Sequence, residues 1–219
     1  MGEHHNGRSG TAEISAAQAP GGGRRVRADA QRNIDAVREA AKAVFAESGV
    51  DAPVREIAAR AGVGVGTLYR HFPQRSDLVV AVFRHEVDAC AAAAPELAAA
   101  HPPGEALARW LRRFTEFVAT KRGLAAALHS GDPAFDALPA HFEAHLRPAL
   151  GSLLESASAA GEVRGDVDPM ELLHAVSNLC MATGGDGSDR SLRMVDLLID
   201  GLHHGAAATA GTAGTDPRR

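Results

Sequence analysis

The stretch that decides the fold is VREIAARAGVGVGTLYRHF, residues 54–72. Apolar residues in its first half recur with the i, i+3, i+4, i+7 spacing of a helix with one buried face: Val54, Ile57, Ala58 and Ala61. Gly62 follows at the position where a helix often ends in the left-handed conformation. Leu68 and Phe72 lie four apart in the second half and point to the same core. The stretch therefore predicts two short helices joined by a tight turn.

This helix-turn-helix layout is typical of DNA-binding domains, in which the second helix enters the major groove. Two short amphipathic helices around a glycine also occur in proteins that never contact DNA, so the flanking sequence has to decide. The candidate DNA contacts are the residues of the second helix and its borders that point away from the core: Gly64, Val65, Gly66, Thr67, Tyr69, Arg70, His71 and Arg75.

The flanking sequence resembles the tetracycline-repressor (TetR) family of bacterial regulators over roughly residues 27–86. Three segments carry the resemblance: NIDAVREAAKAVFAESG at 33–49, VREIAARAGV at 54–63 and GTLYRHFPQRSDLV at 66–79. It implies an all-α protein, with an N-terminal three-helix helix-turn-helix domain that binds double-stranded operator DNA. A C-terminal helical domain is then expected to bind a small-molecule effector and to form a homodimer.

The chain departs from the family pattern just before Gly66. Members often carry a small polar residue and a lysine there, whereas this sequence has Gly64 and Val65. A charge that would contact phosphate or base is missing, and Val65 is instead suited to contact a thymine methyl group. The operator sequence of relatives therefore does not transfer to this chain.

Charge is distributed unevenly within a net charge of -4. Residues 24–86 carry eleven Lys and Arg against eight Asp and Glu, whereas residues 87–219 carry eleven against seventeen. A basic module attached to an acidic remainder suits a protein that presents one end to DNA. The densest basic cluster, before the first expected helix, is Arg24, Arg25 and Arg27. These arginines are expected either to contact the minor groove or phosphates, or to be solvated.

After Phe72 the pattern is helical throughout. Helices are expected from a capping Ser76 to about Ala94, before Pro95, and then over 103–123, 124–128 and 139–160, with two more beginning near Pro169 and Ser188. The predicted organisation is a disordered arm at 1–26, the DNA-binding domain at 27–75, the effector and dimerisation domain at 76–205, and a disordered tail at 206–219.

The candidate effector site is an apolar cavity with a few polar groups. Its proposed residues are Trp110, Phe114, Phe117, His129, Phe142 and His145, with Phe135, Leu138, Leu146 and His141 nearby. An aromatic stripe at helical spacing is also what an ordinary core looks like, and that alternative stays open.

The candidate dimer interface lies on the last two helices, which the family pairs with those of a second copy. Its proposed residues are Leu172, Val176, Val195, Leu198 and Leu202. Each of these two helices has an apolar face that must be buried. Packing within one subunit would bury these faces as well as a dimer would.

A metal-responsive regulator is the alternative that the histidines suggest. His141 and His145 lie at i, i+4 and so share a helix face, a spacing that can hold a zinc ion, with His129 or His174 as further ligands. Glu143 lies between them, so HFEAH is not the HExxH motif. The simpler interpretation is that the spacing arose by chance, with no metal bound.

Other classes of protein find little support. The sequence contains no GxSxG, no phosphate-binding glycine loop and no Cys-x-x-Cys, so we expect neither an enzyme nor a cofactor. No apolar run approaches the about 18 residues that cross a bilayer, and no secretory segment is evident at the N-terminus. We therefore expect a cytoplasmic protein with no membrane partner. Cys90 and Cys180 are expected to be buried thiols without a disulfide.

The function expected from these patterns is that of a ligand-responsive transcriptional regulator. We expect repression, relieved when a small apolar or cationic effector releases the protein from its operator. Activation by the same fold is the alternative.

Deleting residues 1–27 tests the basic arm. Lost phosphate contacts should weaken binding to all DNA and flatten the log–log salt dependence of affinity by about 0.9 per contact. Fluorescence anisotropy over a salt series measures the slope. An unchanged slope would show that the three arginines are merely solvated.

Overall fold

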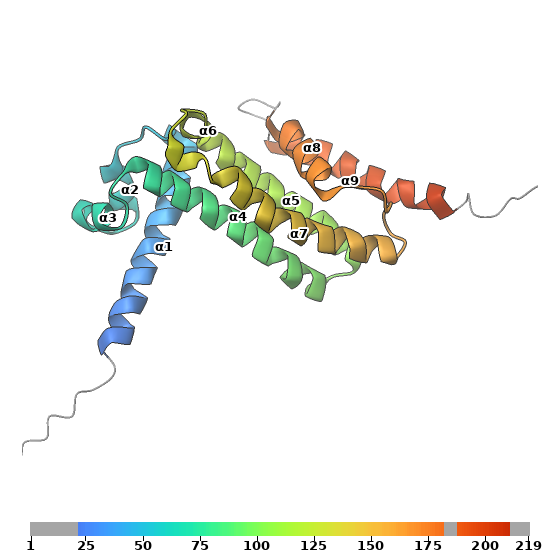
Figure 1. Ribbon diagram of the computed structural model, residues 1–219, viewed down its shortest axis with the longest axis horizontal. Helices are drawn as coiled ribbons and strands as arrows, with labels where there is room; N and C mark the ends of the chain where they lie inside the picture. The colour runs from blue at the N-terminus through green and yellow to red at the C-terminus, as the bar shows by residue number, and fades with distance from the viewer. Residues whose placement is uncertain (1–21, 182–187, 211–219) are drawn as a thin grey trace, which may run out of the picture.

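The computed structural model describes residues 22–181 and 188–210, with side chains over 28–181 and 189–203. Helices dominate these residues, which contain no strand (Figure 1). The all-α expectation is therefore confirmed. The glycine-rich segment 182–187 between the last two helices, most of the N-terminal arm and the end of the tail lie outside the described residues.

The first three helices form a small N-terminal unit at one end of the molecule (Figure 1). They are α1 (Gly22–Ser48), α2 (Val54–Arg60) and α3 (Val65–His71). The apolar stripe of α1 is buried against α2, α4 and α5, with Val37, Ala41, Val44 and Phe45 at its centre. Helix α1 begins at Gly22, within the segment that the sequence assigned to the arm, so Arg24, Arg25 and Arg27 lie on helical backbone.

Helix α4 (Arg75–Ala100) connects this unit to the rest of the chain. It begins at a capping box in which the Gln74 amide N–H donates to Asp77 (2.8 Å), so Gln74 is the N-cap and the expected cap at Ser76 is wrong. Its expected end before Pro95 is also wrong, because the helix continues to Ala100. Pro95 is exposed, and on an exposed face water can satisfy the carbonyl that a proline leaves without its helical partner.

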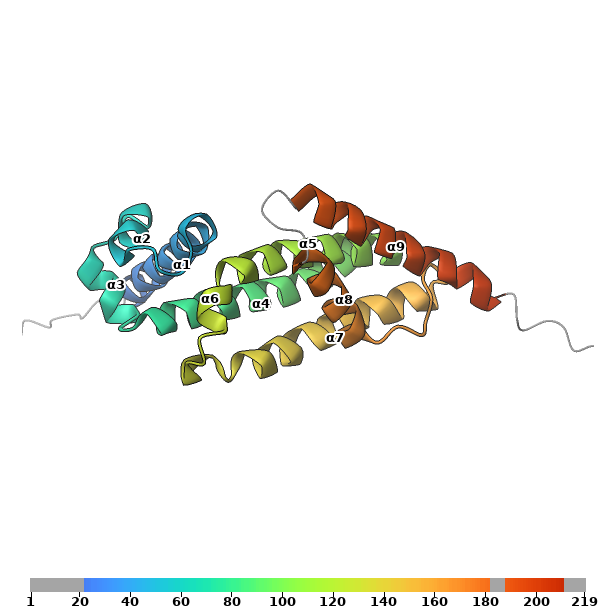
Figure 2. The same cartoon turned by 90° about the horizontal axis from the view of Figure 1, so that it is seen from above.

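Helices α4, α5 (Pro103–Gly123) and α7 (Leu138–Ala159) pack side by side as the body of the molecule (Figure 2). The short α6 (Ala125–Leu128) and the 3₁₀ turn η1 (Pro133–Phe135) connect α5 to α7. The start and end expected for α5 are confirmed. Its aromatic stripe lies entirely inside, with Trp110 and Phe114 fully buried.

The last two helices, α8 (Pro169–Met181) and α9 (Ser188–Ala210), lie together on one side of the body, at the upper right of Figure 1. Both contact α5, and α8 also contacts α7. Polar contacts help to hold α9 in place, two of which are as follows. Arg112 of α5 forms an ion pair with Asp196 (2.9 Å), and the Arg164 amide N–H donates to the Leu202 carbonyl (3.1 Å). In the described part of the chain, no helix is long and apolar enough to cross a membrane.

Candidate nucleic-acid interface and effector cavity

The turn between α2 and α3 has the hydrogen bonds of a Schellman motif. The Val63 amide donates to the Ala58 carbonyl (3.0 Å), and the Gly62 amide donates to the Ala59 carbonyl (3.2 Å). Gly62 has a φ of +67°, as the motif requires. Ile57 and Ala58 are buried on one side of this turn, and Leu68 is buried on the other. These contacts fix the angle between the two helices.

Helix α3 presents its remaining face to solvent. Val65 is 41% exposed and Tyr69 is 48% exposed, so two large side chains of this seven-residue helix lie on the surface. Arg70 is also exposed, and neither Tyr69 nor Arg70 makes a hydrogen bond or ion pair with the described residues. An apolar, an aromatic and a guanidinium group on one short helix are the groups that contact bases and phosphates.

The glycines at the start of α3 leave its backbone uncovered. Gly64 and Gly66 are exposed, and a Cβ added at Gly66 would have no neighbour within 4 Å. Packing within the chain therefore does not explain Gly66. Thr67 and His71 are half-buried at the edges of the same surface. We name the surface made by Gly64, Val65, Gly66, Thr67, Tyr69, Arg70 and His71 the α3 face.

Arg75 differs from the other candidates because it already has partners within the chain. Its guanidinium donates to the backbone carbonyls of Val50 and of Ala52, the latter at 2.8 Å. These carbonyls belong to the α1–α2 loop, so Arg75 fixes that loop to the start of α4. The structure thus gives this arginine a structural role, whether or not its remaining N–H groups reach DNA.

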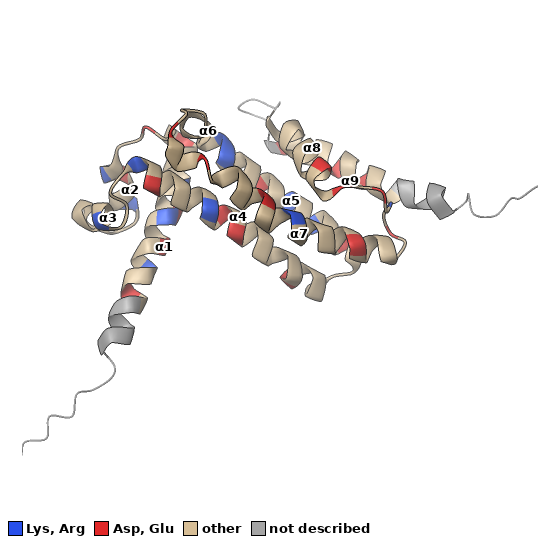
Figure 3. Cartoon of the chain, in the orientation of Figure 1, with Lys and Arg blue, Asp and Glu red and all other residues tan. Residues whose placement is uncertain are grey.

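Lys and Arg positions occur at this end of the molecule, on α2, α3 and the start of α4, and both basic and acidic positions are spread over the body (Figure 3). The predicted contacts Arg24, Arg25 and Arg27 precede the first side chain that the structure describes, so they lie outside the described side chains.

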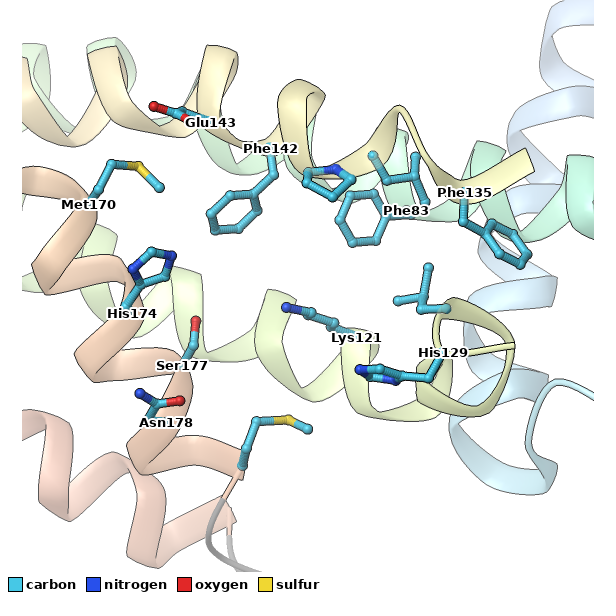
Figure 4. A pocket seen from close by; sticks show the side chains of 14 residues that line it. Phe83, Lys121, His129, Phe135, Phe142, Glu143, Met170, His174, Ser177 and Asn178 are labelled. Atoms are coloured by element: carbon cyan, nitrogen blue, oxygen red, sulfur yellow. The ribbon is translucent and has the colours of Figure 1, made fainter. Parts of the chain in front are cut away.

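A cavity of about 500 Å³ lies between α4, α5, α7 and α8 (Figure 4). Its volume falls in the range of small-molecule sites. Aromatic and aliphatic groups make most of the wall, and polar groups from α5, the α6–η1 segment, α7 and α8 interrupt it. The lining residues are Phe83, Lys121, Leu128, His129, Phe135, Leu138, Pro139, Phe142, Glu143, Met170, His174, Ser177, Asn178 and Met181.

Two of the predicted effector residues, His129 and Phe142, line this cavity, as do the neighbouring Phe135 and Leu138. Trp110, Phe114 and Phe117 do not. They stack behind Phe142 as ordinary core, and the Trp110 indole N–H donates to the Cys90 carbonyl (2.8 Å). The sequence did not predict the lining residues that α8 contributes, such as His174 and Ser177. Helical periodicity identifies which residues form a buried stripe, but it does not show which other helix packs against a polar face.

The four histidines that the sequence suggested as metal ligands form two groups. His129 and His174 lie in the cavity wall. His145, which was expected there, lies instead beside His141, with ring centroids 4.0 Å apart. Both rings approach Asp88 of α4, a residue that the sequence did not suggest. A metal site that combines His141 and His145 with His129 or His174 is therefore wrong for this structure.

The predicted dimer residues are largely internal. Leu172, Val176, Val195 and Leu202 are each no more than 5% exposed, and Leu198 is half-buried. They cover the gap between α8, α9 and α5 within one chain. The exposed large apolar side chains on the described part of this pair are Met181, which also lines the cavity, Leu192 and Leu197, with Leu197 62% exposed. On α9, Leu192 and Leu197 are therefore exposed apolar groups available to a partner.

The two cysteines are free and buried, as expected. Burial raises the pKa of the Cys90 thiol to about 12 and also raises the pKa of Cys180. Neither thiol is activated as a nucleophile at neutral pH.

Comparison with known proteins identifies both parts of this architecture. Residues 37–82 match the family model of tetR-family bacterial regulatory proteins, and residues 102–204 match the SbtR-like transcriptional regulator C-terminal domain. A TetR transcriptional regulator from Streptomyces coelicolor is 37% identical, with a TM-score of 0.69, over 78% of this chain and 98% of that one. This chain belongs to the TetR family of transcriptional regulators. It is a DNA-binding regulator and not an enzyme.

Two further relatives show how far the similarity extends. LfrR, the TetR-like regulator from Mycobacterium smegmatis solved in complex with proflavine, is 26% identical over 78% of this chain and 94% of that one, with a TM-score of 0.59. An HTH-type transcriptional regulator of Staphylococcus aureus is 41% identical over 64 residues, which are 29% of this chain. That match spans only 35% of the relative and is therefore a partial one.

Substitutions on the α3 face test its contact with DNA. Arg70→Ala and Tyr69→Phe should each weaken operator binding by about 1 to 3 kcal/mol per lost base contact. The fold should persist, because both side chains are exposed. Anisotropy titrations at constant salt measure the change. The control is Arg109→Ala, at an exposed position of α5. If both variants bind as tightly as the parent, α3 is not the recognition helix.

Proposed function

We propose that the chain is a homodimeric repressor that an effector bound in the cavity releases from DNA. The observation that carries the proposal is the place of α4. This helix begins beside the α3 face, where Arg75 fixes the α1–α2 loop, and its Phe83 forms part of the cavity wall. One rigid element therefore borders both the proposed DNA-binding surface and the proposed effector site.

The release mechanism follows from spacing. Two-fold operators present half-sites about 34 to 36 Å apart, and both recognition helices must match that distance. An effector that wedges α4 away from α7 would tilt α4 and move the attached α3 face. The effector must bind the DNA-incompetent arrangement more tightly, and operator DNA must then weaken effector binding by the same factor.

The lining groups favour one class of effector. The ammonium of Lys121 points into the cavity (Figure 4) and lies 5.9 Å from the centroid of the Phe142 ring. Glu143 contributes the one carboxylate among the lining residues, and it lies 3.6 Å from Arg147. The positive charge of Lys121 would repel a cationic effector. We therefore favour an apolar molecule that carries an acceptor or an anionic group, over the cationic class that the sequence also allowed.

The cavity is tested by filling it. Ser177→Phe places an aromatic ring among the lining groups, so it should abolish the response to an effector while operator affinity stays within twofold. Effectors are found by a thermal-shift screen of neutral, anionic and cationic apolar compounds without DNA. Each stabiliser is then added to the operator complex in a mobility-shift assay.

Lys121→Met separates the effector classes. It should reduce affinity for an anionic effector at least tenfold and should change affinity for a neutral effector little. Arg109→Met, at an exposed position of α5, should leave both affinities unchanged. If Ser177→Phe retains full release, the effector binds elsewhere. A reporter gene that loses expression on deletion of the regulator would show activation instead of repression.

The dimer is proposed to form through the exposed face of α9 that carries Leu197. Leu197→Glu should give folded monomers. The Leu197 side chain is 62% exposed, so the substitution should disturb the core of the subunit little. Its charge would lose hydration in an apolar interface. Analytical ultracentrifugation measures the change. Ala99→Glu adds the same charge at an exposed position of α4 and should remain dimeric. If Leu197→Glu is also dimeric, the interface does not lie at Leu197 on α9.

A further inference from the structure

Asp88, His141 and His145 form a side-chain cluster that the effector mechanism does not use. Asp88 lies on α4, and the two histidines lie one turn apart on α7. The Asp88 Oδ1 atom is 2.8 Å from His141 Nε2 and 3.7 Å from His145 Nε2. The three potential ligand atoms lie within 4.8 Å of one another. Two imidazoles and a carboxylate thus converge from two helices on one point.

The tautomer of His145 is fixed by its second nitrogen. His145 Nδ1 lies 2.8 Å from the backbone carbonyl oxygen of His141, which only accepts hydrogen bonds. Nδ1 therefore carries a hydrogen, and in the neutral ring the Nε2 lone pair is left to face the cluster. Such a bond to a backbone carbonyl is the usual support of a metal-binding histidine.

That lone pair faces an oxygen that also has only lone pairs. In this tautomer Asp88 Oδ1 and His145 Nε2, 3.7 Å apart, make no hydrogen bond with each other, and a cation or a water between them would satisfy both. One divalent ion would satisfy all three ligand atoms at once.

The spacing fits a tetrahedral ion. Zinc with bonds of about 2.0 to 2.2 Å holds neighbouring ligand atoms about 3.3 to 3.5 Å apart. The two measured distances lie on either side of this value, so small side-chain rotations are sufficient. The side chains of Asp88 and His145 are about half exposed, which leaves one side open to a water molecule as the fourth ligand.

We propose that Asp88, His141 and His145 bind a zinc ion that ties α4 to α7. The site is distinct from the effector cavity, although it uses the same two helices. Phe83 of α4 and Phe142 of α7 line the cavity, whereas Asp88, His141 and His145 are not among its lining residues. Zinc would therefore fix the α4–α7 spacing beside the cavity without occupying it.

Zinc binding to the purified, untagged full chain tests the site without DNA or an effector. The chain has eleven histidines, including the adjacent pairs His4–His5 and His203–His204, so the measurement has to identify the ligands. Isothermal titration calorimetry should find a site that Asp88→Asn, His141→Gln and His145→Gln each weaken at least tenfold. Co²⁺ in the same site should give tetrahedral d–d absorption that these variants lose.

Three variants serve as matched controls. His174→Gln removes a cavity histidine, His85→Gln removes a histidine of the α1–α4 contact, and the double variant His4→Gln/His5→Gln removes a terminal pair. Each should retain the Co²⁺ spectrum and the zinc affinity of that site. Saturating zinc should also raise the Tm of the parent and not that of Asp88→Asn.

Equal zinc affinity and equal Co²⁺ spectra in the parent and in all three ligand variants would overturn the proposal. Loss of the spectrum in a control, with the ligand variants unaffected, would do the same and place the metal elsewhere. Neither result depends on operator release, so the failure of this site and the failure of the effector mechanism are distinguishable.

Discussion

The buried carboxylate of Glu86 determines how the DNA-binding unit is held on the body of the molecule. Glu86 is 4% exposed on α4, and Lys42 of α1 places its ammonium 2.8 Å from it. A carboxylate at this depth needs a partner, because removing one member of a buried pair generally costs about 3 to 5 kcal/mol; the partial exposure of Lys42 lowers that figure. Arg38, also on α1, approaches His85 at 3.1 Å beside this pair. Helix α1 therefore has one favourable position along α4, and the α3 face is oriented by it.

A second contact joins the proposed effector cavity to the same unit through α5. Gly123 ends α5, and a Cβ added there would lie 3.0 Å from the backbone carbonyl oxygen of Phe45 on α1. The two backbones approach closely only because the side chain is absent. Lys121, two residues earlier, lines the cavity. A shift of this end of α5 is thus transmitted to α1 directly, in parallel with the path through α4, and neither path requires a flexible segment.

How far the sequence predicted the molecule depended on whether a feature is local. Gly62 and Leu68 determine the helix-turn-helix through contacts within a few residues, and the structure confirms both. Pro95 misled the prediction, because a local rule ended α4 at a position where exposure to water allows the helix to continue. Asp88 is 53 residues from His141 in the chain, and His174 reaches the cavity from α8. Such meetings depend on how helices pack, which the spacing of apolar residues does not encode.

The leucines of α8 and α9 illustrate the same limit and explain why α5 is central. An apolar stripe on a terminal helix has two possible partners, its own chain or a second copy, and the stripe looks the same in both cases. Here α5 takes the inner stripe, because it contacts both α8 and α9 while also contacting α1, α4 and α7. Only the outer groups, such as Leu197, remain for another subunit. A change in the position of α5 would therefore reach the proposed dimer surface through α9 and the α3 face through α1, so that one helix links these two surfaces.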